Sequence, residues 1–376
     1  IFVPLVGVSI WLGQRIPFDL AEILGVSNAR ATQIWDVILL AYCLVASLIP
    51  MWLLLQPRGH LGGYFLYVAL FGGGLGLIFS GERISYPAFI GWESAGGEPL
   101  FPMLFILIAC GACSGFHAIV ASGTTSKQLR RETDARVIGY GAMLLEAMVS
   151  VVSLCCVMRL ATGSPLLSSK PDVIYAAGIG SFLSRFGVPL TFAVSFGLMA
   201  FTTFVYDTLD VCTRLGRYVV EELTGWHDLR GKIIATAVTS AAPLLFIFQP
   251  PMIVDGKQLP VWKVFWNLFG ASNQLLAALT LLGVTVWLWQ TRRAWWVWPV
   301  AGLPTVWMYT MSAWALVRLI ETHVRARGFV TNPVAWAAVL LLGLAVVMLI
   351  EAILILAARR SPATEPVVAT ATASVE

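Results

Sequence analysis

The stretch that decides the fold is residues 100–122, which read LFPMLFILIACGACSGFHAIVAS. It contains no Asp, Glu, Lys or Arg, and a length of about 20 residues matches the hydrocarbon core of a bilayer. Small residues fill positions 109–115 without interruption. Such a run weakens a helix and lets a backbone or a ligand approach closely. The stretch therefore predicts a membrane-spanning helix that is interrupted in its middle.

Apolar runs of similar length recur along the whole chain. Only helices and closed barrels satisfy their backbone polar groups in lipid, and the runs lack the period-two alternation of barrel strands. We therefore expect an all-α polytopic membrane protein with about nine to ten transmembrane helices. The expected spans are residues 1–12 (a remnant), 35–56, 63–80, 100–122, 137–158, 188–206, 231–248, 262–290, 294–317 and 333–357.

The composition of the chain agrees with a membrane protein. Of its 376 residues, 58% are hydrophobic and 12% are charged, whereas soluble domains carry roughly 25% charged residues. The formal net charge of +4 gives no electrostatic footprint for nucleic acid. The expected surroundings are thus a lipid bilayer, with no nucleic-acid partner. The chain opens inside an apolar run at Ile1, so we expect further residues upstream.

The cysteines and the known motifs point to no cofactor. The six cysteines lie in or beside apolar runs, which argues against a secreted disulfide framework. Cys110 and Cys113 have a redox spacing, but they lie within a span and no second pair accompanies them. No zinc-protease motif and no phosphate loop occurs. We therefore expect no metal and no cofactor.

Lys and Arg orient the bundle. They cluster in residues 123–136 and again in 207–232, and the positive-inside rule makes that side cytoplasmic. Within the second cluster, residues 208–223 are interpreted as an amphipathic cytoplasmic helix rather than a span. Asp210 and Arg214 stand at the i,i+4 spacing of helical ion pairs, as do Arg217 and Glu221. Residues 361–376 have the composition of a disordered tail.

Glu146 is the ionisable residue placed deepest in an expected span. Burying a charge there costs about 2.5–3.5 kcal/mol on insertion scales, so such residues are functional candidates. Gly139, Ala142, Glu146 and Ser153 share one small, polar helix face, which favours contact with other helices or a cavity. Glu146 is then a proton or cation carrier or a gate. A structural hydrogen bond to a neighbouring helix is the open alternative.

The interruption in 100–122 offers a candidate binding site. Transporters use discontinuous helices near the bilayer midplane to bind substrates and ions, which makes Cys110, Gly111, Ser114 and Gly115 candidates. His117 follows directly and titrates near neutral pH. The alternatives are tight helix packing for the small residues and an ordinary core histidine for His117.

A second interruption is expected at residues 267–274, where Gly270 and Ser272 precede two amides. Asn273 and Gln274 carry groups suited to an ion or a carboxylate, and two interrupted spans are a pointer to a transport site. Ser122, Thr124 and Thr125 lie where the first interrupted span ends, and their hydroxyls would coordinate a ligand or gate its path. A plain capping turn is the alternative there.

Two other classes of function compete with a transporter. Residues 112–115 approach the Gly-x-Ser-Gly pattern of intramembrane serine hydrolases, with Ser114 as the nucleophile, but the first Gly is replaced. The histidine nearest in sequence, His117, stands on the same helix. A membrane sensor or scaffold would instead use the amphipathic helix 208–223 to hold a soluble partner. We expect a protein that is not an enzyme.

Several long motifs together resemble the carbon starvation protein A family. They match in order and context, over about residues 35–285. The motifs are residues 50–58 (PMWLLLQPR), 101–117, 122–125 (SGTT), 139–146 (GYGAMLLE), 210–214 (DVCTR) and 268–274 (LFGASNQ). Members of that family begin with further spans, so this chain resembles the C-terminal part of such a protein.

The resemblance implies a multi-span secondary transporter of the cell inner membrane, induced when carbon runs short. It implies uptake of small peptides or of monocarboxylates such as pyruvate, with the proton as coupling ion and a fold related to amino acid–polyamine–organocation transporters. The domains would be residues 1–160 and 185–320, a last helix in 321–360 and the tail. The family-matching positions are His117, Ser122, Thr124, Thr125, Lys127, Glu146, Asn273 and Gln274, with Asp210, Thr213 and Arg214 on a cytoplasmic helix or gate.

Overall fold

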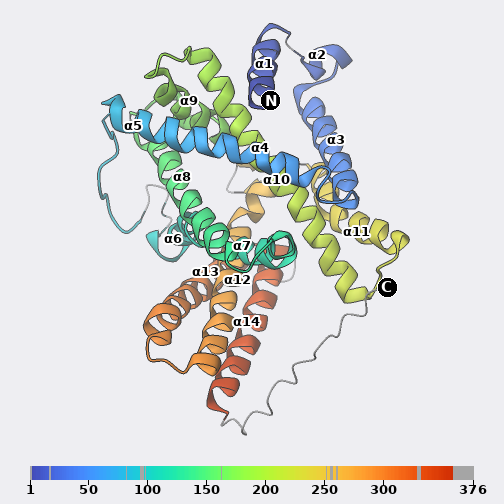
Figure 1. Cartoon of the computed structure of the whole chain (residues 1–376), viewed down its shortest axis with the longest axis vertical. Helices are drawn as coiled ribbons and strands as arrows, with labels where there is room; N and C mark the ends of the chain where they lie inside the picture. The colour runs from blue at the N-terminus through green and yellow to red at the C-terminus, as the bar shows by residue number, and fades with distance from the viewer. Residues whose placement is uncertain are drawn as a thin grey trace. The chain divides into compact units, whose positions relative to one another are not determined.

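A computed structural model of the chain (Figure 1) describes residues 2–16, 18–81, 83–93, 97, 99–161, 163–250, 252–254, 257–259, 261–327 and 332–358. The expected tail 361–376 lies outside the described residues. Two compact units are present, Ile1–Ala277 and Ala278–Glu376, and each is described by itself. The domain boundaries expected from the sequence stay a prediction.

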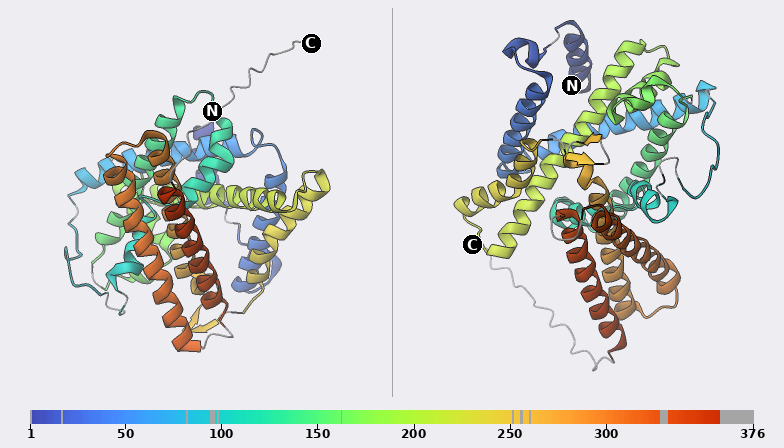
Figure 2. Two further views of the ribbon diagram at one scale, coloured as in Figure 1. Left: turned by 90° about the horizontal axis from the view of Figure 1, so that it is seen from below. Right: turned by 180° about the vertical axis from the view of Figure 1, so that it is seen from behind.

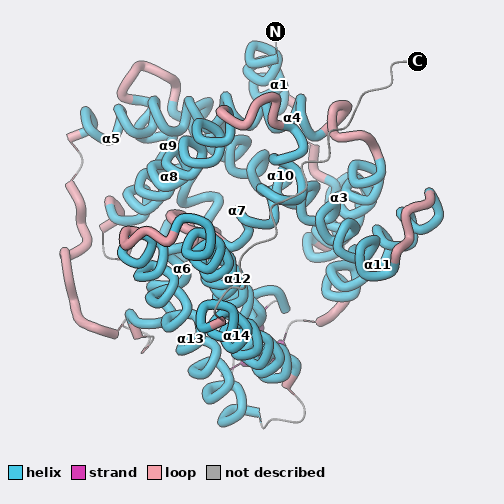
Figure 3. The backbone as a smooth tube through the Cα atoms, turned by 60° about the horizontal axis from the view of Figure 1, so that its bottom comes forward, coloured by secondary structure: helices cyan, strands magenta, loops and turns pink. Residues whose placement is uncertain are grey.

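The first unit is built almost entirely from helices, most of them joined by short turns, with a longer loop leading from α5 toward α6 (Figure 3). Its first half consists of α1 (Phe2–Arg15), α2 (Leu20–Leu24), α3 (Asn28–Leu48), α4 (Leu55–Tyr67), η1 (Val68–Gly73), α5 (Gly74–Ser80), η2 (Leu100–Leu104), α6 (Phe105–Ala109), α7 (Gly115–Val120), η3 (Ala121–Thr125) and η4 (Ser126–Gln128). The segments η1, η2 and η3 are π-helical turns, and η4 is a 3₁₀ turn.

The second half of this unit continues the helical pattern. It consists of η5 (Arg136–Tyr140), α8 (Gly141–Met158), η6 (Pro165–Ser168), α9 (Pro171–Ser184), α10 (Leu190–Thr224) and α11 (Leu229–Ile247), then strands β1 (Met252–Val254) and β2 (Lys257–Leu259). The two strands pair antiparallel as a short hairpin. Helix α12 (Val261–Arg292) begins in the first unit and ends in the second.

The second unit holds the end of α12, the π-helical turn η7 (Trp298–Gly302), α13 (Leu303–Arg327) and α14 (Pro333–Ala357). Helices α13 and α14 lie side by side (Figure 2). Buried alanines on α14, Ala338 and Ala345 among them, let the helix backbones come close. The other face of α14 exposes Leu340, Val347 and Leu354, as expected of a helix in lipid.

Eight helices among the described residues are long and apolar enough to cross a membrane. They are Asn28–Leu48, Leu55–Ser80, Arg136–Met158, Leu190–Thr224, Leu229–Ile247, Lys263–Arg292, Trp298–Arg325 and Pro333–Ala357, and Leu100–Ala109 is a shorter apolar helix. The expected all-α polytopic membrane protein is confirmed. The expected number of full spans, nine, falls to eight because residues 100–122 do not form one continuous helix.

Helix α10 corrects one expectation. We expected a span at 188–206 followed by a separate amphipathic helix at 208–223, but α10 runs unbroken for 35 residues. The charged residues Asp210, Arg214 and Glu221 are buried, whereas Val219 is 52% and Leu223 81% exposed. The charged face therefore packs against other helices, and the apolar residues near the end of α10 point outward.

Helix α12 corrects a second expectation. The break expected at residues 267–274 is absent, because α12 is helical from Val261 to Arg292. Gly270 and Ala271 therefore do not interrupt the helix. Gly270 instead lets α6 pack close to α12, because it faces the side chain of Leu107 on α6.

The core of the first unit lies where α8, α9 and α10 meet. Val152 and Cys156 of α8 pack there against Ile179 and Phe182 of α9, and Ala193 of α10 closes the cluster. None of the six cysteines, all of which lie among the described residues, forms a disulfide. This core fixes α8 and α10, which carry the charged residues considered next.

Candidate functional site

The interruption expected in residues 100–122 is confirmed. Helix α6 ends at Ala109, residues 110–113 form a turn, and α7 begins at Gly115. Ser114 is the N-cap of α7 and has an extended backbone (φ −109°, ψ 138°), and its hydroxyl accepts a hydrogen bond from the Phe116 amide. At the run of small residues one helix therefore ends and a second, capped helix begins; the segment is not a single helix with a kink.

Asn273 of α12 holds this break in place. Its Nδ2 donates to Ser114 Oγ at 2.9 Å and to Cys110 Sγ at 3.3 Å, and its Oδ1 accepts from the Phe116 amide at 2.8 Å. The residue is 8% exposed. A backbone amide freed by the break would be costly if it were buried without a partner, and Asn273 supplies that partner from a distant helix.

Gly115 lets α12 approach the break. A Cβ at this position would lie 2.7 Å from the amide nitrogen of Ala277 and 2.7 Å from Cβ of Leu276, which is closer than such atoms pack. Gly111, in the turn before it, faces Ser150 of α8. The small residues of the motif are therefore needed for close packing, and this packing places Asn273 against the cap.

Gln274 also turns toward the interrupted segment. It is fully buried, and its Nε2 donates to the carbonyl of Ile106 at 3.3 Å. Its Oε1 has no hydrogen-bond partner among the residues that the structure describes. The two amides expected from the sequence thus meet the broken span, although α12 itself is continuous.

His117 and Glu146 form the charged part of the site. Nε2 of His117, on α7, lies 2.5 Å from Oε2 of Glu146, on α8. Their side chains are 34% and 46% exposed, so the pair is reachable from outside the packed helices. Ser150 donates to the carbonyl of Glu146 and stiffens this turn of α8. A short imidazole–carboxylate contact of this kind can hold and pass a proton.

The hydroxyls after α7 do not join this pair. Ser122 Oγ donates to the carbonyl of Ile119 at 3.2 Å, and Thr124 Oγ1 donates to that of Val120 at 3.0 Å. Thr125 is the last residue of η3. Ser122 and Thr124 therefore satisfy carbonyls of their own helix end, which is the capping alternative.

The residues expected on a cytoplasmic helix lie in a second charged cluster. Asp210 pairs with Arg58 of α4 rather than with Arg214. Arg214 donates to the carbonyls of Ala46 and Ile49 at 2.6 and 2.7 Å, where it caps the C-terminus of α3 and suits its helix dipole. Thr213 bonds back to its own helix. The other pair expected on α10, Arg217–Glu221, is present at 3.2 Å.

Sequence reasoning missed two partners in this second cluster. Arg58 falls between the expected spans 35–56 and 63–80, but it lies on α4 within a helical stretch of 26 residues, Leu55–Ser80. Tyr42 falls within the expected span 35–56, and its hydroxyl accepts a hydrogen bond from Arg58. The signal available for Arg58 was its place at the end of the motif 50–58 that carries the family resemblance.

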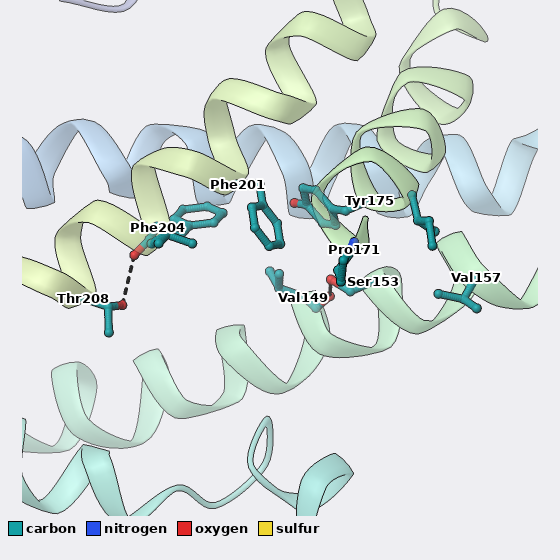
Figure 4. Close-up of a pocket in the computed structure, with 10 residues that line it drawn as sticks. Val149, Ser153, Val157, Pro171, Tyr175, Phe201, Phe204 and Thr208 are labelled. Atoms are coloured by element: carbon teal, nitrogen blue, oxygen red, sulfur yellow. Dashed lines mark hydrogen bonds between the residues drawn. The ribbon is translucent and has the colours of Figure 1, made fainter. Parts of the chain in front are cut away.

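A cavity of about 550 Å³ lies between α8, α9 and α10 (Figure 4). Its walls are mostly apolar, and the hydroxyls of Ser153 and Thr208 bond to carbonyls of their own helices. None of the site residues expected from the sequence lines it. The lining residues are Val149, Ser153, Val157, Pro171, Ile174, Tyr175, Phe201, Phe204, Val205 and Thr208.

Comparison with known families shows which family the chain belongs to. The model of the carbon starvation protein CstA family matches residues 1–174 and 161–315. The chain belongs to the carbon starvation protein CstA family. The resemblance of the motifs 101–117 and 268–274 is thereby confirmed, and these are the segments that meet at Ser114 and Asn273.

Relatives of the CstA-family chain are named as transporters. It is 31% identical to the pyruvate/proton symporter BtsT of Escherichia coli K12 over 77% of this chain and 51% of that protein. It is 29% identical to the peptide transporter CstA of Helicobacter pylori 26695 (76% and 50%) and 28% to that of Bacillus subtilis 168 (82% and 58%). The chain spans about half the length of the curated relatives it matches. No solved structure matches it.

Proposed function

We propose that this CstA-family chain takes part in secondary uptake of small peptides or small carboxylates such as pyruvate across the cell inner membrane during carbon starvation, with the proton as coupling ion. The names of its relatives support this class of substrate. The eight helices long and apolar enough to span a membrane, found among the described residues, support a multi-pass carrier. In this proposal the protein is a transporter and not an enzyme.

The observation that carries the proposal is the contact between His117 and Glu146 beside the broken helix. A single proton neutralises the carboxylate or charges the imidazole, so the pair changes its net charge when it gains or loses one. A helix break that is held by side-chain hydrogen bonds can rearrange more easily than a continuous helix. Proton binding at the pair and movement of α7 are therefore coupled in this proposal.

The amides of α12 take the substrate role in the proposal. Asn273 and Gln274 hold α6 and α7 from the opposite side of the break. The Oε1 of Gln274 and the polar groups around Ser114 supply donors and acceptors for a peptide or a carboxylate once α7 moves.

The hydrolase alternative gains no support from the geometry. The hydroxyl of Ser114 is hydrogen-bonded to Asn273, and the imidazole of His117 to Glu146. A serine nucleophile needs a base within hydrogen-bond reach, and these two side chains bond elsewhere.

The experiment is uptake into proteoliposomes containing the full chain, with and without an inward proton gradient. The labelled substrates are a dipeptide and pyruvate. Wild-type protein accumulates at least one of them only with the gradient, and His117→Ala and Glu146→Gln abolish the accumulation. The matched controls are His227→Ala and Glu222→Gln, since both residues are exposed and stand apart from the break. Gradient-driven uptake that survives both site variants contradicts the coupling role.

A further inference from the structure

A second charged cluster joins α3, α4 and α10, away from the His117–Glu146 pair. The guanidinium of Arg58 reaches two carboxylates that stand one turn apart on α10. Its Nε lies 3.2 Å from Oδ1 of Asp207, and its Nη1 bonds to Oδ2 of Asp210. We call these three residues the α4–α10 triad. They are partly to deeply buried, with side chains 18%, 23% and 4% exposed for Arg58, Asp207 and Asp210.

Aromatic residues hold the guanidinium of the triad. Arg58 Nη1 donates to the Tyr42 hydroxyl at 2.7 Å, and that hydroxyl lies 3.3 Å from Oδ2 of Asp210. The guanidinium carbon also lies 5.3 Å and 5.9 Å from the ring centres of Tyr42 and Tyr206, in the range of cation–π contacts. These contacts fix the position of the Arg58 guanidinium, so it cannot rotate to form a complete ion pair with each carboxylate.

The charges of the triad do not balance, because two carboxylates share one guanidinium. The other cation that acts on Asp210 is Arg214. Its guanidinium is bonded to the carbonyls of Ala46 and Ile49 at the end of α3, where a helix already carries partial negative charge. The neutral groups beside the carboxyls are Tyr42 and Cys43. One negative charge of the triad therefore lacks a counter-charge.

Asp210 shows where the excess charge lies. The residue is 3% exposed, and its Oδ1 has no hydrogen-bond partner among the described residues. A bare carboxylate oxygen away from water is costly. Two carboxylates that share one site relieve this cost when one of them binds a proton. Oδ1 of Asp207 also has no hydrogen bond among the described residues, but it lies in the ion pair with Arg58 Nε at 3.2 Å. Asp210 Oδ1 is therefore the atom on which that proton fits.

A cavity adjoins the triad at Arg58. It has a volume of about 300 Å³ and is lined by Tyr42, Cys43, Arg58 and Tyr206, together with Leu39 and Leu209. It is large enough for water, and the side chains of Tyr42, Arg58 and Tyr206 offer the polar partners that a water molecule needs in an otherwise mostly apolar lining. Gly62 of α4 leaves room for Asp207, because a Cβ there would lie 2.7 Å from Oδ2 of that residue. Protons can therefore exchange at this cluster.

We propose that the α4–α10 triad is a proton-binding site separate from the His117–Glu146 pair. The Asp207–Asp210 pair holds one exchangeable proton, which is bound to Asp210 Oδ1. Hydronium in the cavity gives its proton to this oxygen and leaves as water. With the proton bound, Arg58 keeps one full ion pair. When the proton leaves, two carboxylates compete for Arg58, so the proton sets how α4 is held to α10.

The test is infrared spectroscopy of the full chain in lipid nanodiscs, with ¹³C-labelled aspartate to separate aspartic acids from Glu146. A shifted C=O band of a protonated aspartic acid is expected at neutral pH and disappears at alkaline pH. Asp210→Asn removes the band because the seat of the proton is gone. Asp207→Asn also removes it because the excess charge is gone. Asp134→Asn, between η4 and η5 and away from the triad, leaves the band unchanged.

Two results overturn the proposal: no titrating aspartic-acid band in the wild type, or a band that persists in both triad variants. Either variant alone suffices if the other does not fold. The proposal does not require transport. A band without any substrate uptake contradicts the proposed function alone, and uptake without a band contradicts the triad alone.

Discussion

Nε2 of His117, on the helix α7 that begins directly after the break, lies 2.5 Å from Oε2 of Glu146 on α8. The side chains of this pair are partly exposed, whereas Asn273, which holds the same break from α12, is buried. The break is therefore held rigidly by Asn273, whereas the His117–Glu146 pair beside it can exchange protons. The predictions below separate these two roles.

Asn273 should matter for stability as well as for transport. Asn273→Ala removes one of the two acceptors of the Phe116 amide and the side-chain partner of the Ser114 hydroxyl. It should lower the free energy of unfolding by about 1–3 kcal/mol. Thermal unfolding in detergent measures this. Ser272→Ala is the matched control on α12, because the Ser272 hydroxyl bonds only within its own helix, to the carbonyl of Phe269. Equal stability of the two variants would contradict the role of Asn273.

The variant Asn273→Asp separates the hydrogen-bond acceptor of the Asn273 side chain from its donor. The carboxylate keeps an acceptor for the Phe116 amide and loses the donor to Ser114 and Cys110. We expect a melting temperature between those of the wild type and Asn273→Ala. A variant as unstable as Asn273→Ala would mean that the donor side carries the contact.

Gly115→Ala should separate α7 from α12. The new Cβ would lie 2.7 Å from the amide nitrogen of Ala277, and such overpacking costs about 1–3 kcal/mol. Melting temperature and uptake should both fall. Gly141→Ala serves as the control because nothing lies within 4 Å of a Cβ there. In that variant stability should hold or rise, since Ala favours a helix by about 1 kcal/mol.

Arg214 should be a structural residue of α10. Its two hydrogen bonds to the end of α3 are largely buried and charge-assisted. Arg214→Ala should therefore lower the free energy of unfolding by at most about 1.5–3 kcal/mol for each hydrogen bond lost. Arg214→Lys should recover part of this loss. Arg230→Ala, at an exposed position near the start of α11, should have little effect on the melting temperature. A neutral Arg214→Ala would show that the cap on α3 contributes nothing.

The length and spacing of the apolar runs were enough to predict a helical membrane protein, and the small residues at 109–115 were enough to predict a break. Both follow from local chemistry. The contact between Ser114 and Asn273 joins residues 159 positions apart, and local sequence shows only that both are polar. Gly270 misled the prediction of a second break, because a glycine that packs against Leu107 looks the same in sequence as one that ends a helix.

Helix α10 shows a second limit of the sequence. Periodicity identified an amphipathic helix correctly, but it does not say which face is buried. In water the charged face points outward, and in a membrane bundle the charged face can point inward to ion-pair partners. Arg58, a distant partner, was needed to decide between the two, and no local pattern linked it to Asp210.

The measurement that tests the central claim most directly compares two modes of transport in one reconstituted variant, Glu146→Gln. Counterflow exchanges labelled for unlabelled substrate and needs no net proton movement, whereas accumulation against a gradient does. The account predicts that Glu146→Gln retains counterflow and loses proton-driven accumulation by about tenfold or more, a coupling loss of at least about 1.4 kcal/mol. Proton-driven accumulation that equals the wild type in this variant would contradict the account.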